Sequence, residues 1–123
     1  MYWLINSYTV LARALTWVGS LAIVVLSIVP ADDRPVTGFG QNLEHFAVFA
    51  LAGAVFAIGY YLSPMRLLVV AIIFCAGIEL LQVPLPTRHA RLSDFLVDSV
   101  GACLAIACVV SLSRSSALGR DHE

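Results

Sequence analysis

Four long apolar runs constrain this chain more than any other feature. Short segments that carry prolines and charged residues separate the runs from one another. A helix that crosses a bilayer needs roughly 20 mostly apolar residues, within a range of about 17–25. We therefore expect an all-α membrane protein, a compact bundle of four transmembrane helices. Their expected positions are about 11–29, 43–62, 65–83 and 94–112.

The composition supports a bilayer as the solvent for these runs. Hydrophobic residues make up 60% of the chain and charged residues only 12%, whereas about a quarter of an ordinary soluble domain is charged. At 123 residues one domain is expected, and we assign it to residues 1–112, followed by a polar C-terminal tail at 113–123. The net charge of −1 offers no basic footprint for nucleic acid, so no nucleic-acid partner is predicted.

The first apolar run has a second interpretation, as a cleaved signal peptide. Val29 and Ala31 are small enough to occupy its cleavage positions. The run is long for the apolar core of a signal peptide, and only one arginine, Arg13, precedes it. We therefore favour a membrane-spanning helix, which the mass of the purified protein would distinguish from a processed chain.

Four spans place both termini on the same side of the membrane. Short-loop arginines favour the cytoplasmic side, and the terminal side holds one more arginine than the other. The terminal side has Arg13, Arg66, Arg114 and Arg120, and the opposite side has Arg34, Arg88 and Arg91. This bias predicts that both termini are cytoplasmic.

Antiparallel topology gathers the polar residues of three spans at one membrane face. The start of the second span, the end of the third, the following loop and the start of the fourth all meet there. The residues concerned are Glu44, His45, Glu79, Gln82, Arg88, Arg91, Asp94 and Asp98. A charge at mid-bilayer costs about 2.5–3.5 kcal/mol on insertion scales, so we expect these side chains to point inward as one polar cluster.

This cluster has both binding and structural interpretations. Arg88 and Arg91 suit a phosphate or carboxylate, because guanidinium is a planar fork of donors. Gln82, Asp98 and Glu44 are further candidates for ligand binding. The structural alternatives are a Glu79–Arg88 pair that pins the loop to the bundle and an N-cap role for Asp94.

Acid–base chemistry is the second functional interpretation. The candidate catalytic residues are His45, Glu79 and Asp94, in which a carboxylate of Glu44, Glu79 or Asp94 would orient the imidazole. Histidine with carboxylates could also bind a divalent metal, but HExxH or comparable ligand spacing does not occur. Walker, GxGxxG and GxSxG motifs are also missing from the sequence. We predict no metal and no cofactor.

Small residues recur along the expected spans. We expect Gly53, Gly59, Gly77 and Gly101 to mark close helix contacts, because small residues let helices approach in lipid. Such stripes would also permit a homo-oligomer. The three cysteines, Cys75, Cys103 and Cys108, lie within apolar runs and are expected to pack as small hydrophobic residues.

The polar residues follow a pattern that resembles the VanZ-like family of small bacterial membrane proteins, named for a teicoplanin-resistance protein. The matching elements are His45-Phe46, Glu79-Leu80-Leu81-Gln82, Pro86-Thr87-Arg88, Asp94 and Gly101. Two departures are clear: Gln41 and Asn42 stand where the family often has Asp-Lys, and Asp98 stands where it usually has asparagine. The resemblance covers about residues 41–105.

The resemblance implies a compact helical bundle in the bacterial inner membrane. Together with the polar cluster it suggests a protein that binds an amphiphile at the extracytoplasmic face. The ligand would be a lipid head group, a cell-wall precursor or a lipophilic glycopeptide antibiotic. The alternative is an intramembrane enzyme that modifies such a molecule by His/carboxylate chemistry. Transport through so small a bundle would require oligomerisation.

Overall fold

Four helices account for most of the chain in the computed structural model, which describes residues 2–30, 33, 38–86 and 90–118. They are α1 (Tyr2–Ile28), α2 (Gln41–Gly59), α3 (Pro64–Gln82) and α4 (Leu92–Leu118), and the described residues contain no strand. All four are long and apolar enough to cross a membrane. The predicted all-α bundle of four transmembrane helices is confirmed, and the protein is a multi-pass membrane protein.

The outer helices are longer than predicted. α1 begins at Tyr2 instead of about residue 11. α4 continues to Leu118, so residues 113–118 of the expected polar tail are helical. In this last part the hydroxyls of Ser113, Ser115 and Ser116 donate to backbone carbonyls four residues earlier. These serines satisfy their own polar groups on the helix, which lets it extend beyond the apolar run.

The inner helices end close to where the sequence predicts. α2 stops at Gly59, three residues before the expected end, because Tyr60 adopts an extended backbone conformation. α3 begins at Pro64, whose fixed backbone angle and missing N–H suit the first position of a helix. The resulting connection between α2 and α3 is very short.

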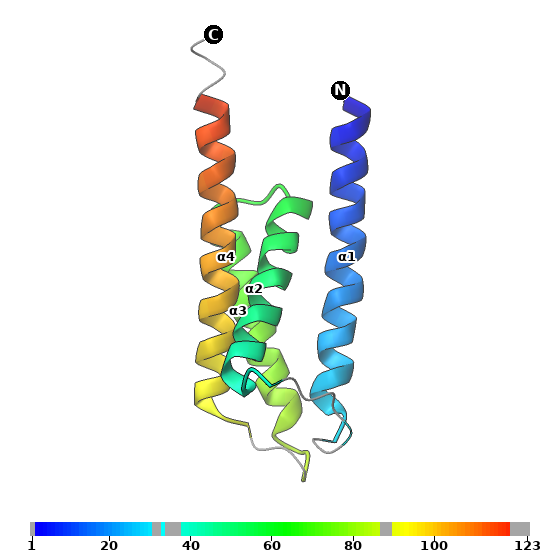
Figure 1. The fold of residues 1–123 in the computed structure, drawn as a ribbon, viewed down its shortest axis with the longest axis vertical. Helices are drawn as coiled ribbons and strands as arrows, with labels where there is room; N and C mark the ends of the chain where they lie inside the picture. Colours follow the sequence, from blue (N-terminus) through cyan, green and yellow to red (C-terminus); the bar gives the residue numbers. More distant parts are fainter. Residues whose placement is uncertain (1, 31–32, 34–37, 87–89, 119–123) are drawn as a thin grey trace.

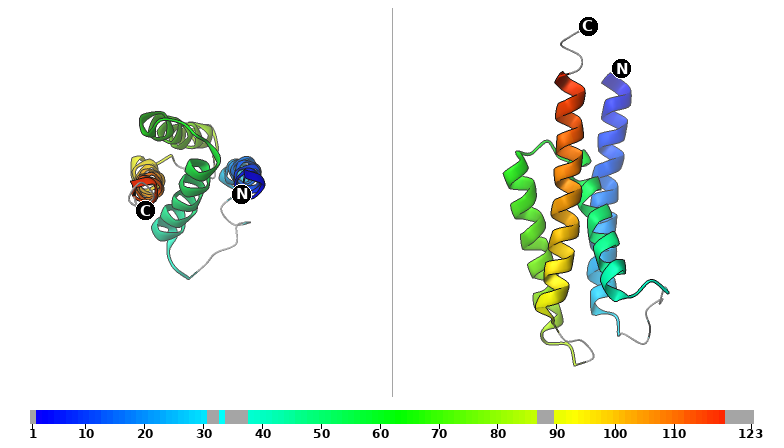
Figure 2. Two further views of the ribbon diagram at one scale, coloured as in Figure 1. Left: turned by 90° about the horizontal axis from the view of Figure 1, so that it is seen from above. Right: turned by 60° about the vertical axis from the view of Figure 1, so that its left-hand side comes forward.

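The helices run antiparallel, with both termini at the same end of the bundle (Figure 1). We call this the loop 2 end, because residues 60–63 connect α2 and α3 there. The connections 29–40 (loop 1) and 83–91 (loop 3) have their described residues, 29–30, 33, 38–40, 83–86 and 90–91, at the opposite end, which we call the loop 1/loop 3 end. Seen from above, α2 occupies the centre, with α1 on one side and α4 on the other (Figure 2). The contact between α2 and α4 is the most extensive in the bundle.

Glycines explain why α2 and α4 pack so closely. A Cβ added at Gly53 would lie 2.6 Å from the carbonyl oxygen of Ala102, and one added at Gly101 would lie 2.7 Å from that of Phe46. A Cβ at Gly59 would lie 3.1 Å from the backbone nitrogen of Arg13. The predicted packing role is confirmed for these three glycines.

Gly77 is different, and its predicted packing role is wrong. A Cβ at this position would meet no atom within 4 Å.

The three cysteines differ in burial: Cys75 lies in the core, Cys103 is half-buried and Cys108 is exposed on α4. The core around Cys75 is formed by apolar side chains from all four helices. It contains Ile23, Phe49, Leu67, Ala71, Cys75, Ile78, Ala102 and Ile106.

Candidate functional site

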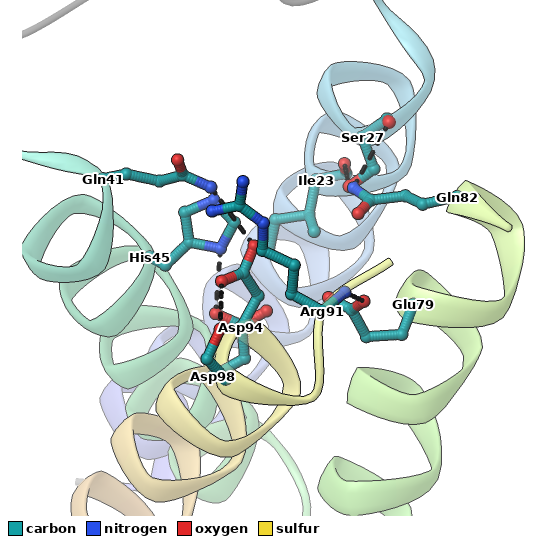
Figure 3. Close-up of polar contacts among 10 residues, drawn as sticks. Ile23, Ser27, Gln41, His45, Glu79, Gln82, Arg91, Asp94 and Asp98 are labelled. Atoms are coloured by element: carbon teal, nitrogen blue, oxygen red, sulfur yellow. Dashed lines mark hydrogen bonds and ion pairs between the residues drawn. The ribbon is translucent and has the colours of Figure 1, made fainter. Parts of the chain in front are cut away.

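His45 and Asp98 form the deepest polar contact at the loop 1/loop 3 end. His45 Nδ1 lies 3.1 Å from Asp98 Oδ1, and Asp98 is completely buried. The two residues come from α2 and α4, whose close approach at Gly101 brings the first turns of both helices together. Figure 3 shows the imidazole and the carboxylate facing each other between these helices.

Asp94 precedes Asp98 by one helical turn of α4, and it binds Gln41 of α2 instead of His45. Its Oδ2 accepts a hydrogen bond of 3.2 Å from Gln41 Nε2, and its Oδ1 accepts one of 3.1 Å from Ser93 Oγ. Asp94 is buried. Since α4 begins at Leu92, Asp94 lies inside the first turn, so the predicted N-cap role for Asp94 is wrong. The carboxylate still suits this position electrostatically, because the N-terminus of a helix is positive.

Glu79 connects α3 to the segment that precedes α4. Its Oε2 accepts a hydrogen bond of 3.1 Å from the backbone N–H of Arg91. The contact joins the last turn of α3 to the last residue of loop 3 and fixes the entry of the chain into α4. The predicted partner Arg88 lies outside the described residues, so the Glu79–Arg88 pair stays a prediction.

Gln82 is buried but faces a different neighbour from Glu79. Its Nε2 donates to the carbonyl oxygen of Ser27 at 3.4 Å. Ser27 belongs to the last turn of α1, where carbonyls lack a partner within the helix. The hydroxyl of Ser27 is also buried and donates to Ile23. Gln82 therefore ties α3 to α1, and the structure gives it no hydrogen bond to His45, Asp94 or Asp98.

Two further predicted ligand-binding residues, Arg91 and Glu44, lie around Asp94 and Asp98. Arg91 is exposed, and its side chain extends toward Gln41, His45 and Asp94 (Figure 3). Glu44 is half-buried in the first turn of α2. We call Gln41, His45, Glu79, Arg91, Asp94 and Asp98 the polar cluster. In the described part of the chain, no three His, Cys, Asp or Glu residues gather as they would around a metal ion.

The hydrogen bonds of the polar cluster leave two carboxylate oxygens unsatisfied. Both Asp98 Oδ2 and Glu79 Oε1 are buried atoms that accept no hydrogen bond from the described residues. A buried oxygen that has lost water without gaining a donor costs about 1–3 kcal/mol, and more when it is charged. The polar cluster is therefore neither a fully satisfied network nor freely hydrated.

Sequence patterns identified the cluster but not its pairings. The carboxylate against His45 is Asp98, whereas Glu44, Glu79 and Asp94 were the expected candidates. Gln41 was absent from the predicted site, although it binds Asp94. It precedes His45 by four residues on the same helix and thus shares its face, which is a signal that could have indicated its role.

Fold and site together define a small multi-pass membrane protein with a polar cluster, in which Asp94 and Asp98 are buried, at one end of a four-helix bundle. The VanZ/LLP1 family model matches residues 4–113, nearly the whole chain. The chain belongs to this family, and the resemblance based on residues 41–105 is confirmed and extended. No curated protein and no solved structure matches the chain.

Proposed function

We propose that the polar cluster binds the polar group of an amphiphile that enters from the surrounding leaflet. The ligand is a lipid head group, a cell-wall precursor or a lipophilic glycopeptide antibiotic. The observation that carries this proposal is Asp98 Oδ2, a buried carboxylate oxygen to which no residue in the described part of the chain donates a hydrogen bond. Because Asp98 is completely buried, a ligand donor reaches this oxygen only when the surrounding side chains move aside. The donor would then remove the cost of leaving the oxygen unsatisfied.

The charges of the cluster define which ligand groups it suits. Asp94, Asp98 and Glu79 contribute carboxylates, while Arg91 contributes a guanidinium at the exposed edge. Hydroxyl, amide or ammonium donors of the ligand would bind the carboxylates. A phosphate or carboxylate of the same ligand would bind Arg91 through the planar guanidinium. A ligand that carries both donors and an anionic group fits best.

The arginines also support an orientation for this site. In the sequence, four arginines belong to the side of the termini (Arg13, Arg66, Arg114 and Arg120) and three to the other side (Arg34, Arg88 and Arg91). By the short-loop arginine rule the termini are cytoplasmic. The polar cluster then lies at the extracytoplasmic face of the bacterial inner membrane. A reporter fused after Glu123 that is active only outside the cytoplasm would contradict this orientation.

The alternative, intramembrane acid–base catalysis, rests on the contact between His45 and Asp98. A carboxylate hydrogen-bonded to one ring nitrogen orients an imidazole for proton transfer. In this version Asp98 orients His45, and Glu79 and Asp94 are not its partners. Lipid mass spectrometry of cells with and without the protein tests it. Identical lipid and precursor profiles would count against a covalent reaction.

Native mass spectrometry of the detergent-purified protein tests binding. The probes are phosphatidylethanolamine, a polyprenyl-linked cell-wall precursor and teicoplanin, each titrated separately. We expect Asp98→Asn and Arg91→Ala to weaken binding of the preferred probe about tenfold or more, because charged hydrogen bonds are lost. Arg114→Ala, which removes an arginine from the other end, serves as the matched control.

Folding must be checked before these results are compared. Helical content and elution volume should be the same for the wild type and each variant. Unchanged affinity in folded Asp98→Asn and Arg91→Ala variants would contradict the proposed site. If the wild type binds none of the probes, the structural interpretation of the cluster gains support.

A further inference from the structure

A second feature lies in the other half of the bundle, away from the polar cluster. It is an apolar groove of about 370 Å³ between α1 and α3, with α2 as its floor. The side chains that line it come mainly from these three helices. They include Thr16, Trp17, Phe49, Phe56, Tyr60, Val70 and Phe74. Trp17 and Val70 are exposed, so the groove opens sideways into the membrane.

The length of the groove along α2 is close to the thickness of the hydrocarbon part of one leaflet. Along α2 its lining runs from Phe49, at the middle of the helix, to Tyr60 just after the last residue. With a rise of about 1.5 Å per residue this span is about 16 Å, close to half of a hydrocarbon core of about 30 Å. The groove thus extends from the membrane boundary at the loop 2 end to the midplane of the bundle.

Polar groups occur at the boundary end of the groove. Trp17 Nε1 donates to the Tyr60 hydroxyl at 2.9 Å, and both rings line the groove. Arg13 Nε donates to the Gly59 carbonyl at 2.8 Å, and its guanidinium carbon lies 5.4 Å from the centre of the Tyr60 ring. Tryptophan, tyrosine and arginine at this depth are typical of a membrane interface.

Charge distinguishes this end of the bundle from the other. The described acidic residues all lie at the loop 1/loop 3 end: Asp33, Glu44, Glu79, Asp94 and Asp98. The described charged residues at the loop 2 end are all arginines, namely Arg13, Arg66 and Arg114. An anionic group at the boundary end of the groove therefore finds Arg13 beside it, and no described carboxylate lies at this end of the bundle.

We propose that this groove binds one acyl chain of an anionic phospholipid from the leaflet at the loop 2 end, with its phosphate at Arg13. The chain lies along α2 from Tyr60 to Phe49. The Nε of Arg13 is engaged with Gly59, and the terminal nitrogens of the guanidinium bind the phosphate.

The charges also decide between a lipid and a second copy of the protein. A copy in the same membrane orientation brings its own arginines to the same level, which places like charges next to Arg13. A phosphate there is attracted instead, and an arginine near an anionic membrane surface contributes about fivefold in affinity. The site is separate from the polar cluster, so its test does not depend on the proposed function.

Quenching of Trp17 fluorescence by brominated lipids tests the proposal. The chain has two tryptophans, so the experiment uses Trp3→Phe protein reconstituted in phosphatidylcholine vesicles. Brominated phosphatidylglycerol or brominated phosphatidylcholine is then added at increasing mole fraction. We expect half-maximal quenching at a mole fraction about fivefold lower for phosphatidylglycerol. Equal curves for the two lipids would overturn the proposal.

Two pairs of variants locate the site. Arg13→Gln should abolish the preference for phosphatidylglycerol, whereas Arg66→Gln, at the same end, should keep it. Val70→Phe should reduce quenching at low mole fraction, because Val70 lines the groove. Val69→Phe is its matched control: both valines are 46% exposed, but Val69 does not line the groove.

Each remaining outcome decides for or against the groove. If Arg13→Gln does not fold, Arg13→Lys keeps the charge and should keep most of the preference. Equal losses in Arg13→Gln and Arg66→Gln would assign the effect to general surface charge. Equal losses in Val70→Phe and Val69→Phe would place the lipid elsewhere. A wild-type dimer without lipid preference would assign the groove to a second copy.

Discussion

The two halves of this bundle differ in how they accommodate polar atoms within a membrane. At the loop 1/loop 3 end, carboxylates are buried and paired across helices, as in the contact of His45 with Asp98. Toward the loop 2 end the interior is an apolar groove, and polar groups such as Arg13 lie at its mouth. The first arrangement needs close helix packing to hold the partners together. The second leaves α1 and α3 apart and open to lipid.

The contact between α2 and α4 supports both halves, so breaking it should have the largest effect. Gly53→Ala places a Cβ where it would lie 2.6 Å from the Ala102 carbonyl oxygen, a backbone atom that cannot move aside alone. We expect a loss of about 3 kcal/mol in the free energy of unfolding, at the upper end of typical overpacking costs. Denaturation by SDS in mixed micelles, followed by circular dichroism, measures it.

Gly77→Ala is the matched control for this prediction. A Cβ at Gly77 meets no atom within 4 Å, and alanine favours a helix over glycine by up to about 1 kcal/mol. The control should be unchanged or slightly stabilised. Equal stability of the two variants would show that α2 and α4 are not in close contact.

Substitution of Asp98 tests how much the contact between His45 and Asp98 contributes to the stability of the fold. Asp98→Ala removes the contact with the half-buried His45 and the buried carboxylate itself, which should cost about 2 kcal/mol in the free energy of unfolding. Asp98→Asn keeps the shape and a hydrogen-bonding group and removes the buried charge. It should change stability by less than about 1 kcal/mol.

The same denaturation assay measures both Asp98 variants. Asp33→Ala, which removes an exposed acid in loop 1, is the control and should be neutral within about 0.5 kcal/mol. If Asp98→Ala is as stable as the wild type, the His45–Asp98 contact does not stabilise the fold.

Gln82 tests the hydrogen bond between α3 and α1 at the loop 1/loop 3 end. Gln82→Leu removes the donor to the Ser27 carbonyl, a bond that is long at 3.4 Å. We expect a loss of about 1 kcal/mol, at the low end of the cost of a buried unsatisfied carbonyl. Asn42→Leu, an exposed amide at the same end, is the control, and a loss as large in this variant would contradict a specific role for Gln82.

Trp17 tests the hydrogen bond that connects α1 to Tyr60 at the loop 2 end, and its substitution should give the smallest effect. Trp17→Phe removes an exposed hydrogen bond to Tyr60, which should cost about 0.5 kcal/mol. Combining it with Gln82→Leu measures whether the two ends act independently. The two losses should add within about 0.5 kcal/mol, because the sites are far apart. Strong non-additivity would show that the two ends are coupled through α1.

Much of the fold was accessible from the sequence because apolar length is a local property. The prolines at positions 64, 84 and 86 and the polar loops marked the boundaries of the inner helices within a few residues. The outer helices were underestimated, because polar helical residues such as Ser113 and Ser115 of α4 give no apolar signal in the sequence. The packing of Gly53 and Gly101 was predictable, but the open surroundings of Gly77 were not.

The candidate site was predictable in membership and depth, but not in its contacts. Antiparallel topology requires that His45, Glu79 and Asp98 share one layer, whatever the details of packing. Which carboxylate meets His45 depends on the rotation of α2 against α4, and this follows from the close approach at Gly53 and Gly101. Sequence spacing defines the face of each helix and does not define how two faces are rotated against each other.

The sequence by itself determined that this chain forms four membrane-spanning helices, that its polar residues gather at one end, and that it resembles the VanZ-like family. These conclusions follow from local apolarity, from alternating direction and from a short polar pattern. Only the tertiary structure decided that Asp98 is the partner of His45, that Gln82 binds α1, and that an apolar groove ends at Tyr60, beside Arg13. These contacts depend on how closely pairs of helices approach, which is set by side chains distant in the sequence.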